Sequence, residues 1–304
     1  MRLNLKQLEA FVWVADMQSF RRAAERLNTT QPNISARIAG LEGALNTQLM
    51  TRDAGSVRLT RKGQELLSHA RRVLDATEAL VVAADQKGLL SGTLRLGVTE
   101  MIVHTWLRDY LRALKDDYPN LVVELTVDLS VNLEKGLAER TLDLALQNGP
   151  FSRMSSGEIT LGSYDMVWVA APEIAPGGIA TAEDLAQHPI LTHARNTRLF
   201  DEVSAHFAMR RDLDVRLVPS SNLAACLHMT LDGMGIATLP RAMVSGELAR
   251  GALCEIQYDW SPAPLDFYAR YDAERAAHSV VTCAEAAVRV AQQYDHKNLL
   301  YVSN

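Results

Sequence analysis

The sequence predicts an α/β protein built from a small helical head, a long connecting helix and a larger body of two α/β subdomains. Three observations support this prediction. Short apolar stripes at helical spacing fill residues 5–45, an uninterrupted helical pattern without proline runs from residue 60 to about residue 91, and strand-like apolar runs then alternate with helical patterns. A length of 304 residues is typical of two or three domains rather than one core.

Composition narrows the class of protein. No stretch approaches the roughly 18 to 20 apolar residues of a membrane span, and the first 16 residues carry charges throughout, unlike a signal peptide. The three cysteines are widely spaced and form no C-x-x-C pair: Cys226, Cys254 and Cys283. This spacing favours buried thiols in a reducing cytosol over a redox pair or a metal site. We therefore expect a cytoplasmic protein with no membrane partner, no metal and no cofactor.

The net charge of -5 is unevenly distributed along the chain. Residues 1–62 hold ten Lys/Arg against five Asp/Glu, whereas the remainder holds 21 against 31. A basic head on an acidic body is typical of a polyanion-binding module attached to a second domain. Chance clustering of charge is the alternative.

The head begins with a helix expected over residues 5–16. One face of this helix is apolar and can pack against later helices: Leu8, Phe11, Val12 and Ala15. A second helix carries Ala23, Ala24 and Leu27 at helical spacing, and its small alanines let a neighbouring helix approach closely.

A short polar break at residues 28–30 precedes a third helix. Thr30 is a suitable N-cap, and Pro32 fits a first turn, where no backbone donor is lost. The buried stripe of this helix steps by four, three and four residues: Ile34, Ile38, Leu41 and Leu45.

The outward face of the third helix carries side chains that can bond base edges and phosphates: Gln31, Asn33, Ser35 and Arg37. The helix N-terminus itself favours phosphate. These features predict a helix-turn-helix whose second helix enters the major groove of DNA. An ordinary three-helix core with a solvated charged face is the alternative interpretation.

Residues 51–59 predict a tight hairpin with an arginine on each arm, Arg52 and Arg58. A basic hairpin beside a recognition helix is placed to hold phosphates or the minor groove, as the wing of a winged helix does.

Residues 5–63 resemble the DNA-binding domain of LysR-type transcriptional regulators. The matching motifs are F-x-x-V-A, S-F-x-x-A-A-x-x-L, T-Q-P-x-I-S, I-x-x-L-E and L-T-x-x-G. The resemblance implies DNA-facing roles for eight residues: Thr30, Gln31, Pro32, Asn33, Ser35, Arg37, Arg52 and Arg58. Ala36 and Met50 depart from the family pattern, where a polar or basic residue and a phenylalanine are more common.

The connecting helix carries a heptad-like apolar seam: Leu66, Ala70, Val73, Thr77, Leu80 and Ala84. Some 28 helical residues span roughly 40 Å. We expect that the small head cannot bury the whole apolar surface of so long a helix. The same helix of a second subunit is therefore the expected partner, and a core helix of the next domain is the alternative. Two symmetric heads imply inverted-repeat half-sites, and the resemblance adds that such dimers commonly pair into homotetramers.

After a hinge at residues 91–92, the body begins with a β-α-β-α-β pattern. Strands are expected at 93–98, 121–127 and 142–147, with helices at 106–115 and 133–139. This run favours a parallel sheet covered by helices. The later pattern is looser: strands at 166–170, 190–192, 215–218, 236–239 and 265–271, and helices at 222–231 and 277–293.

The body resembles the effector domain of the same family, which is similar to periplasmic binding proteins. The matching pieces are LRLGV, DDYPNLVVEL, the L-D-L-A near Asp143 and DGMGIATLP. The implied domains are 1–60 for a winged helix-turn-helix, 61–91 for a dimerisation helix and hinge, and 92–304 for effector binding. Residues 92–163 with 268–304 would form one subdomain of that body, and residues 164–267 the other.

Ligands in open α/β sheets bind at the carboxyl ends of strands, and the resemblance places an effector there. The candidate effector-binding residues are Thr99, Glu100, Met101, Ser130, Asn148, His193, Thr197 and Asn222. Most are short hydrogen-bonding residues that could equally be plain helix caps.

The effector is expected to be an organic acid or an amino acid, because many effectors in the family are small carboxylates and helix N-termini suit anions. Glu100 departs from that pattern: it could repel an anion, cap a helix or bind an ammonium group. His104, His193 and Arg195 could supply compensating charge.

No P-loop, H-E-x-x-H or G-x-S-x-G motif is present. The leading hypothesis is therefore a LysR-type regulator and not an enzyme. Its partners would be double-stranded promoter DNA, a small effector and further copies of itself, with RNA polymerase as an additional candidate. A solute-binding protein or cleft enzyme that ignores DNA is one alternative, and a regulator that senses an oxyanion is another.

Overall fold

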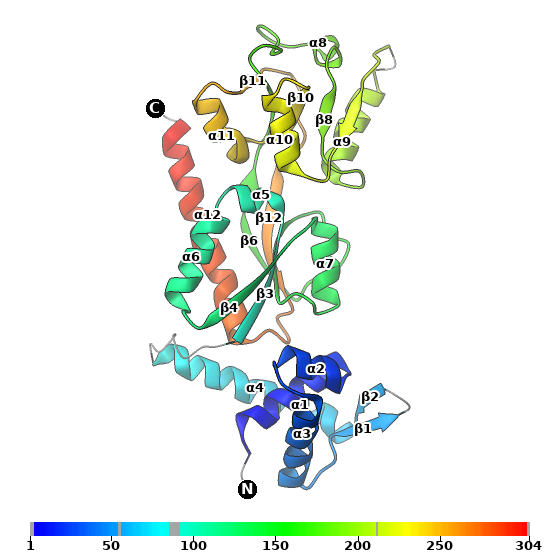
Figure 1. The fold of residues 1–304 in the computed structure, drawn as a ribbon, viewed down its shortest axis with the longest axis vertical. Helices are drawn as coiled ribbons and strands as arrows, with labels where there is room; N and C mark the ends of the chain where they lie inside the picture. Colours follow the sequence, from blue (N-terminus) through cyan, green and yellow to red (C-terminus); the bar gives the residue numbers. More distant parts are fainter. Residues whose placement is uncertain (1–2, 54–55, 85–91, 211, 303–304) are drawn as a thin grey trace. The chain divides into compact units, whose positions relative to one another are not determined.

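The computed structural model describes residues 3–53, 56–84, 92–210 and 212–302, with the backbone alone at 52, 53, 56, 82, 83 and 297–302. The chain forms two compact units, which we call the head and the body (Figure 1). The head comprises Met1–Ser91 with Arg275–Val281, and the body comprises Gly92–Glu274 with Thr282–Asn304.

Three short helices form the core of the head: α1 (Leu5–Met17), α2 (Phe20–Arg26) and α3 (Gln31–Leu45). Each begins at a polar side chain that accepts a hydrogen bond from the first turn: Asn4, Ser19 and Thr30. The predicted apolar stripes are buried against one another in a single cluster that includes Phe11, Ala23, Ile34, Ile38 and Leu41. The predicted helix-turn-helix is confirmed.

The antiparallel hairpin of β1 (Met50–Asp53) and β2 (Ser56–Leu59) is fixed to α3 by one carboxylate. Glu42 accepts hydrogen bonds from the backbone amides of Leu49 at 2.7 Å and Met50 at 3.1 Å. The Thr60 hydroxyl donates to the Gln48 carbonyl at 2.8 Å and so ties the other end of the hairpin to the same place. These hydrogen bonds therefore fix the position of the hairpin relative to α3.

The connecting helix α4 runs from Arg61 to Ala83, and the predicted continuation over residues 85–91 lies outside the described residues. Part of the apolar surface of α4 packs on the head itself: Leu66, Leu67, Ala70 and Leu74. Asp16 of α1 forms a largely buried ion pair with Arg71. Val73 and Leu80 stay exposed, at 47% and 69% of their surface.

The first sheet of the body has the strand order β4-β3-β5-β12-β6. Its strands are β3 (Gly92–Val98), β4 (Leu121–Val127), β5 (Leu144–Asn148), β6 (Gly157–Tyr164) and β12 (Leu265–Tyr271). β3, β4 and β5 are parallel, as predicted, but β12 runs antiparallel to both β5 and β6. The sheet is mixed because the chain returns to it only after building the second sheet.

The second sheet has the order β11-β7-β10-β8-β9. Its strands are β7 (Met166–Ala170), β8 (Ile190–Thr192), β9 (Leu217–Pro219), β10 (Ile236–Pro240) and β11 (Cys254–Ile256). β10, β8 and β9 are parallel, and β7 is antiparallel to both β10 and β11. Two sheets linked by two crossings of the chain give the two-subdomain α/β body predicted from the sequence.

Helices cover the sheets of the body (Figure 1). They are α5 (Glu100–His104), α6 (Leu107–Asp117), α7 (Ser130–Ala138), α8 (Ala182–Ala186), α9 (Arg198–Ala208), α10 (Leu223–Leu231), α11 (Arg241–Ala249) and α12 (His278–Val302). The predictions omitted α5, α8, α9 and α11, together with strands β6 and β11. α7 also starts three residues earlier than expected, at Ser130.

A buried ionic group fixes α7 to the first sheet. Arg270 of β12 is only 2% exposed, and its Nη1 lies 3.5 Å from the Glu134 carboxylate of α7. Glu134 also accepts hydrogen bonds from the backbone amides of Ser152 and Arg153, at 3.2 and 2.6 Å. Each buried charge is thereby paired, as burial requires.

Within the described part of the chain, none of the helices has the length and apolar character to cross a membrane. The same residues contain no group of three or more His, Cys, Asp or Glu side chains arranged to hold a metal ion. All three cysteines are unpaired with one another, and Cys226 and Cys283 are buried.

A substitution of Gly63, at the start of α4, tests the packing of the head. A Cβ there would overlap the Leu49 carbonyl oxygen, a backbone atom that cannot move aside easily, so Gly63→Ala should lower the free energy of unfolding of the head by about 1–3 kcal/mol. Hydrogen exchange of head amides in the full chain measures this.

The matched control is Gly43→Ala in α3, where a Cβ would meet nothing within 4 Å. Because alanine favours a helix interior, this change should stabilise the head by about 0.5–1 kcal/mol. Equal effects of the two substitutions would contradict the packing described.

Candidate functional site

The exposed tip of α3 carries the predicted DNA-facing residues. The Thr30 hydroxyl accepts a hydrogen bond from the Asn33 amide at 3.4 Å, so the helix starts there. Gln31, Pro32 and Asn33 follow on the exposed surface, and Ser35 and Arg37 are half-buried one turn further on. The structure therefore brings these six residues together on the first two turns of one helix.

Asn33 is held in a defined orientation. Its Nδ2 donates to the Thr29 hydroxyl at 3.2 Å, from the polar break before the helix. An orientation fixed before binding reduces the side-chain entropy that ordering would otherwise cost.

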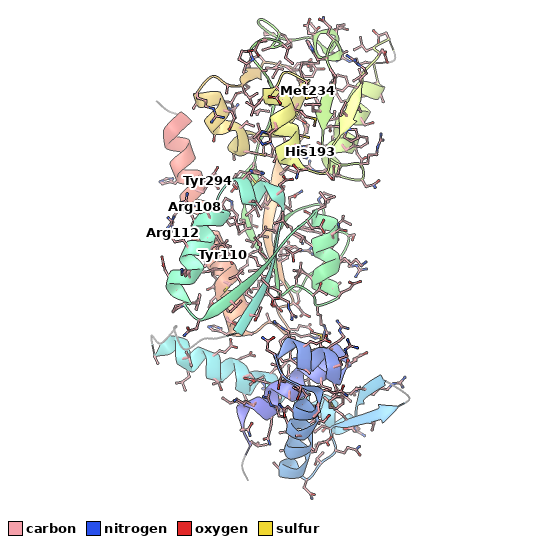
Figure 2. All side chains as sticks on the ribbon, viewed as in Figure 1. Arg108, Tyr110, Arg112, His193, Met234 and Tyr294 are labelled. Atoms are coloured by element: carbon pink, nitrogen blue, oxygen red, sulfur yellow. The ribbon has the colours of Figure 1, made fainter. Side chains whose placement is uncertain are left out.

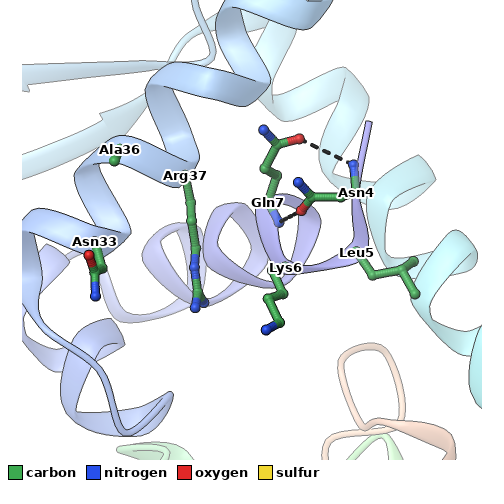
Figure 3. Close-up of a pocket in the computed structure, with 7 residues that line it drawn as sticks. All are labelled: Asn4, Leu5, Lys6, Gln7, Asn33, Ala36 and Arg37. Carbon is green, nitrogen blue, oxygen red and sulfur yellow. Dashed lines mark hydrogen bonds between the residues drawn. The ribbon is translucent and has the colours of Figure 1, made fainter. Parts of the chain in front are cut away.

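A shallow open hollow lies between α3 and the start of α1 (Figure 3). Its lining residues are Asn4, Leu5, Lys6, Gln7, Asn33, Ala36 and Arg37. The side chains of Arg37 and Lys6 extend to the same side in this view, and both cations lower the pKa of Glu9, which burial raises above its ordinary value. Lys6 is a cation that the sequence analysis did not select, although its place in the first turn of the first helix was a usable signal.

Both predicted wing arginines lie on strands of the hairpin. Arg58 of β2 is exposed and pairs in register with Thr51. Arg52 pairs through its backbone with Val57, and its side chain lies outside the described residues.

In the body, four candidate effector residues lie at or beside the carboxyl ends of β3 and β5. Thr99 is buried directly after β3 and begins α5 without a side-chain capping bond. Ser130, the first residue of α7, donates its hydroxyl to the Asn148 side-chain oxygen at 3.0 Å. Met101 is buried within α5.

Three further candidates lie in the second subdomain, and two of them are helix caps. Thr197 accepts a hydrogen bond from the Phe200 amide at 3.3 Å, and Asn222 accepts one from the Ala225 amide at 2.6 Å. Both side chains therefore act as helix caps, the alternative role that the sequence left open for them.

His193 is the third of these candidates and follows β8, at the end of its subdomain that faces α5 (Figure 2). Its Nε2 lies 3.3 Å from the Thr238 carbonyl oxygen, which can only accept, so Nε2 carries the proton. Burial lowers the pKa of His193 to about 4, against the weaker opposing influences of that carbonyl and of the Glu100 carboxylate. The imidazole is therefore neutral at pH 7.

Glu100 reaches from the first subdomain to the second. Its two carboxylate oxygens accept hydrogen bonds from the backbone amides of Leu223 at 2.6 Å and Ala224 at 3.1 Å, in the first turn of α10. His104 lies 3.6 Å from the same carboxylate. Among the roles considered for Glu100, the structure shows that of a helix cap.

Four polar side chains near these strand ends, Thr99 among them, are buried without a hydrogen-bond partner. The unpartnered atoms are the hydroxyl oxygens of Thr99, Thr192 and Thr238 and both amide atoms of Gln147. Each side chain is at least 93% buried. Buried polar atoms of this kind require a partner. The predicted site residues did not include Gln147, Thr192 and Thr238, whose signal is a polar residue inside an otherwise apolar buried strand.

The pairing register brings these groups together two by two. Val98 of β3 lies opposite Leu146 of β5, so Thr99 and Gln147 are the next neighbours along the two strands. Ala237 of β10 lies opposite Leu191 of β8, and Thr238 and Thr192 follow in the same way. Each sheet thus presents a pair of uncharged hydrogen-bonding side chains at its strand ends.

The winged helix-turn-helix head and the two-subdomain body together define a transcriptional regulator that binds DNA and responds to an effector. Two family models cover the chain: residues 5–64 match the bacterial regulatory helix-turn-helix protein, lysR family, and residues 87–291 match the LysR substrate binding domain. The chain belongs to the LysR family of transcriptional regulators. This membership rules out the alternatives of a cleft enzyme and of a solute-binding protein that ignores DNA.

Curated relatives agree over most of their length. A probable hydrogen peroxide-inducible genes activator of Mycobacterium avium is 30% identical over 256 residues, covering 83% of this chain and 82% of the relative. The HTH-type transcriptional regulator PtxR of Pseudomonas aeruginosa is 29% identical over 277 residues, covering 90% of this chain and 88% of the relative.

Solved structures share the fold. Full-length LysG from Corynebacterium glutamicum with bound effector Arg has a TM-score of 0.58 at 17% identity, covering 96% of this chain and 99% of that one. Full-length CbnR in complex with its target DNA has a TM-score of 0.51 at 20% identity, covering 95% and 100%.

The buried neutral His193 should make stability depend on pH. Its folded pKa of about 4 lies below the ordinary 6.5, so the unfolded chain binds a proton first as the pH falls. Stability from this residue is complete above pH 6.5 and should fall by about 1.4 kcal/mol per pH unit towards pH 4. Denaturant unfolding of the full chain between pH 4 and pH 7 measures this slope.

His193→Gln provides the comparison, because it keeps a donor but cannot titrate. The difference in unfolding free energy between the two proteins should shrink by about 3 kcal/mol from pH 7 to pH 4. A constant difference across this range would contradict the buried neutral imidazole.

Proposed function

We propose that two heads of this regulator bind an inverted-repeat promoter site and that a small effector held in the body controls their arrangement. The observation that carries the DNA part is the exposed tip of α3, which presents Gln31 and Asn33, in a head that also carries the arginine-bearing hairpin. Gln and Asn side chains recognise adenine edges in the major groove, and arginines contact phosphates or guanine. CbnR, which shares the fold, has been solved in complex with its target DNA, and this supports DNA binding by the present chain.

Specific roles follow from exposure and chemistry. Gln31 and Asn33 contact base edges, while Thr30, Pro32, Ser35 and Arg37 position the helix tip and the phosphates around it. Arg52 and Arg58 hold the backbone beside the major groove. Two cations, Lys6 and Arg37, line the hollow of Figure 3, and this supports phosphate contact there.

The effector is a small polar molecule from the organic acids and amino acids, bound between the two subdomains. Unpartnered hydroxyl and amide groups on Thr99, Gln147, Thr192 and Thr238 support this site, because a bound ligand would supply the missing hydrogen bonds. Ser130, Asn148, His193 and Thr197 complete its surroundings. The arginine bound to LysG supports the amino-acid class.

The functional form is a homodimer through α4, which pairs further into a homotetramer, with RNA polymerase as an additional partner on the promoter. Val73 and Leu80 support the dimer, since both apolar side chains are exposed on the predicted seam of the helix. An effector can change transcription only by favouring one arrangement of these subunits over another.

Two variants separate base reading from phosphate contact. Gln31→Ala should weaken binding to the specific promoter by about 1–3 kcal/mol and relax the preference for one base pair, with little effect on random DNA. Gel-shift titration with the DNA upstream of this gene and with a shuffled duplex measures both.

Arg58→Ala should instead weaken binding to every duplex and lower the slope of log K against log salt by about 1. Indistinguishable losses on specific and shuffled DNA for both variants would contradict these roles.

The dimer seam is tested by adding a charge to it. Leu80→Glu should dissociate the full chain, because a carboxylate would be buried in an apolar helix pair. Ser68→Glu places the same charge on the opposite side of α4 and should leave the assembly intact. Sedimentation velocity distinguishes the two, and a wild-type chain that sediments as a monomer would refute the dimer.

A further inference from the structure

The first turn of α10 has no backbone donor left for a ligand. The amide of the N-cap residue Asn222 donates to the Ser220 hydroxyl, the amides of Leu223 and Ala224 donate to Glu100, and the amide of Ala225 donates to the Asn222 side chain. A helix leaves its first four amides without internal partners, and these groups are what draws anions to helix N-termini. In α10 all four are already bonded.

The charge of Glu100 completes this arrangement. Its carboxylate lies in the favourable field of the helix N-terminus, and its side chain is only 19% exposed. Glu100 thus does within one chain what a bound carboxylate would do, and it joins α5 of one subdomain to α10 of the other.

The remaining groups at this place are uncharged, already committed or exposed to solvent. His193 is neutral, and the unpartnered atoms belong to three threonines and a glutamine. Arg198 is paired with Glu202 at 2.7 Å and also donates to the carbonyls of Ala263 and Pro264. Arg195 is exposed and lies 5.3 Å from the Phe200 ring centre.

We infer that Glu100 is a built-in anion that determines the charge class of the effector: the ligand is uncharged or cationic where it meets α10, and no ligand carboxylate binds there. This inference rests on the proposed effector site and narrows its ligand away from simple organic acids. An amine, an amide or the ammonium end of an amino acid fits hydroxyl and amide partners beside a carboxylate, whose further lone pairs can accept from a donor.

The test uses acetate as the probe and Cys226 as the reporter. Cys226 is 1% exposed in α10 and donates to the Thr192 carbonyl, so its labelling by N-ethylmaleimide requires the α10 region to open. Peptide mapping by mass spectrometry separates it from Cys254 and Cys283. Full-length Glu100→Ala should label at Cys226 at least about tenfold faster than the wild type, because two charge-assisted hydrogen bonds are lost.

Acetate should restore slow labelling in Glu100→Ala, because a small carboxylate fits the space that the substitution vacates. It should leave the wild type unchanged. Glu100→Gln fills that space with an amide, so its labelling should rise without rescue by acetate. Glu183→Ala removes an exposed acid from the first turn of α8 and should match the wild type throughout.

Two results would overturn the inference: unchanged Cys226 labelling in both Glu100 variants, or equal protection of the wild type and Glu100→Ala by acetate. If Glu100→Ala does not fold, the Glu100→Gln result alone decides whether the carboxylate holds α10. None of these measurements uses DNA. Failure of the proposed function would appear separately, as a wild-type chain without preference for promoter DNA.

Discussion

The amide groups at helix N-termini need acceptors, and this requirement shapes both functional regions of the molecule. In the head, Thr30 supplies the acceptor for α3, and the helix can therefore begin with Gln31, Pro32 and Asn33 on the exposed surface. In the body, Asn222 and Glu100 divide the amides of α10 between them. The first arrangement leaves side chains available to a partner, and the second closes a helix end to ligand anions.

A second acceptor, the Glu42 carboxylate, holds α3 and the hairpin of the head together. It bonds the amides of Leu49 and Met50 at the entry to the hairpin, while Gly63 lets α4 pass against the Leu49 carbonyl. Both residues belong to motifs that are shared with the LysR family, I-x-x-L-E and L-T-x-x-G. Their chemistry explains the motifs without reference to DNA, because each residue fixes the hairpin relative to α3.

The head could be predicted almost completely from the sequence because its signals are local. Caps, apolar stripes and the polar break all lie within a few residues of the structure that they determine. In the body, the parallel strands β3, β4 and β5 were predicted from their local pattern, but the order of the first sheet depends on β12, which returns after more than a hundred residues. Strand β6 was missed, although its residues alternate in burial, and α5 is too short to produce a helical period.

The role of Glu100 could not be predicted for the same reason: its partners are 123 and 124 residues away in the chain. Hydrogen bonds to a charged group contribute roughly 1.5–3 kcal/mol each, and effectors typically change an equilibrium by about 1–3 kcal/mol. The two bonds together are at least as large as this coupling, so the contact between α5 and α10 is strong enough to hold the two subdomains in one arrangement. A ligand that competes for Glu100 would weaken this contact, and one that satisfies Thr99, Gln147, Thr192 and Thr238 while leaving Glu100 on α10 would strengthen it. The sign of the response thus depends on which of these groups the ligand engages.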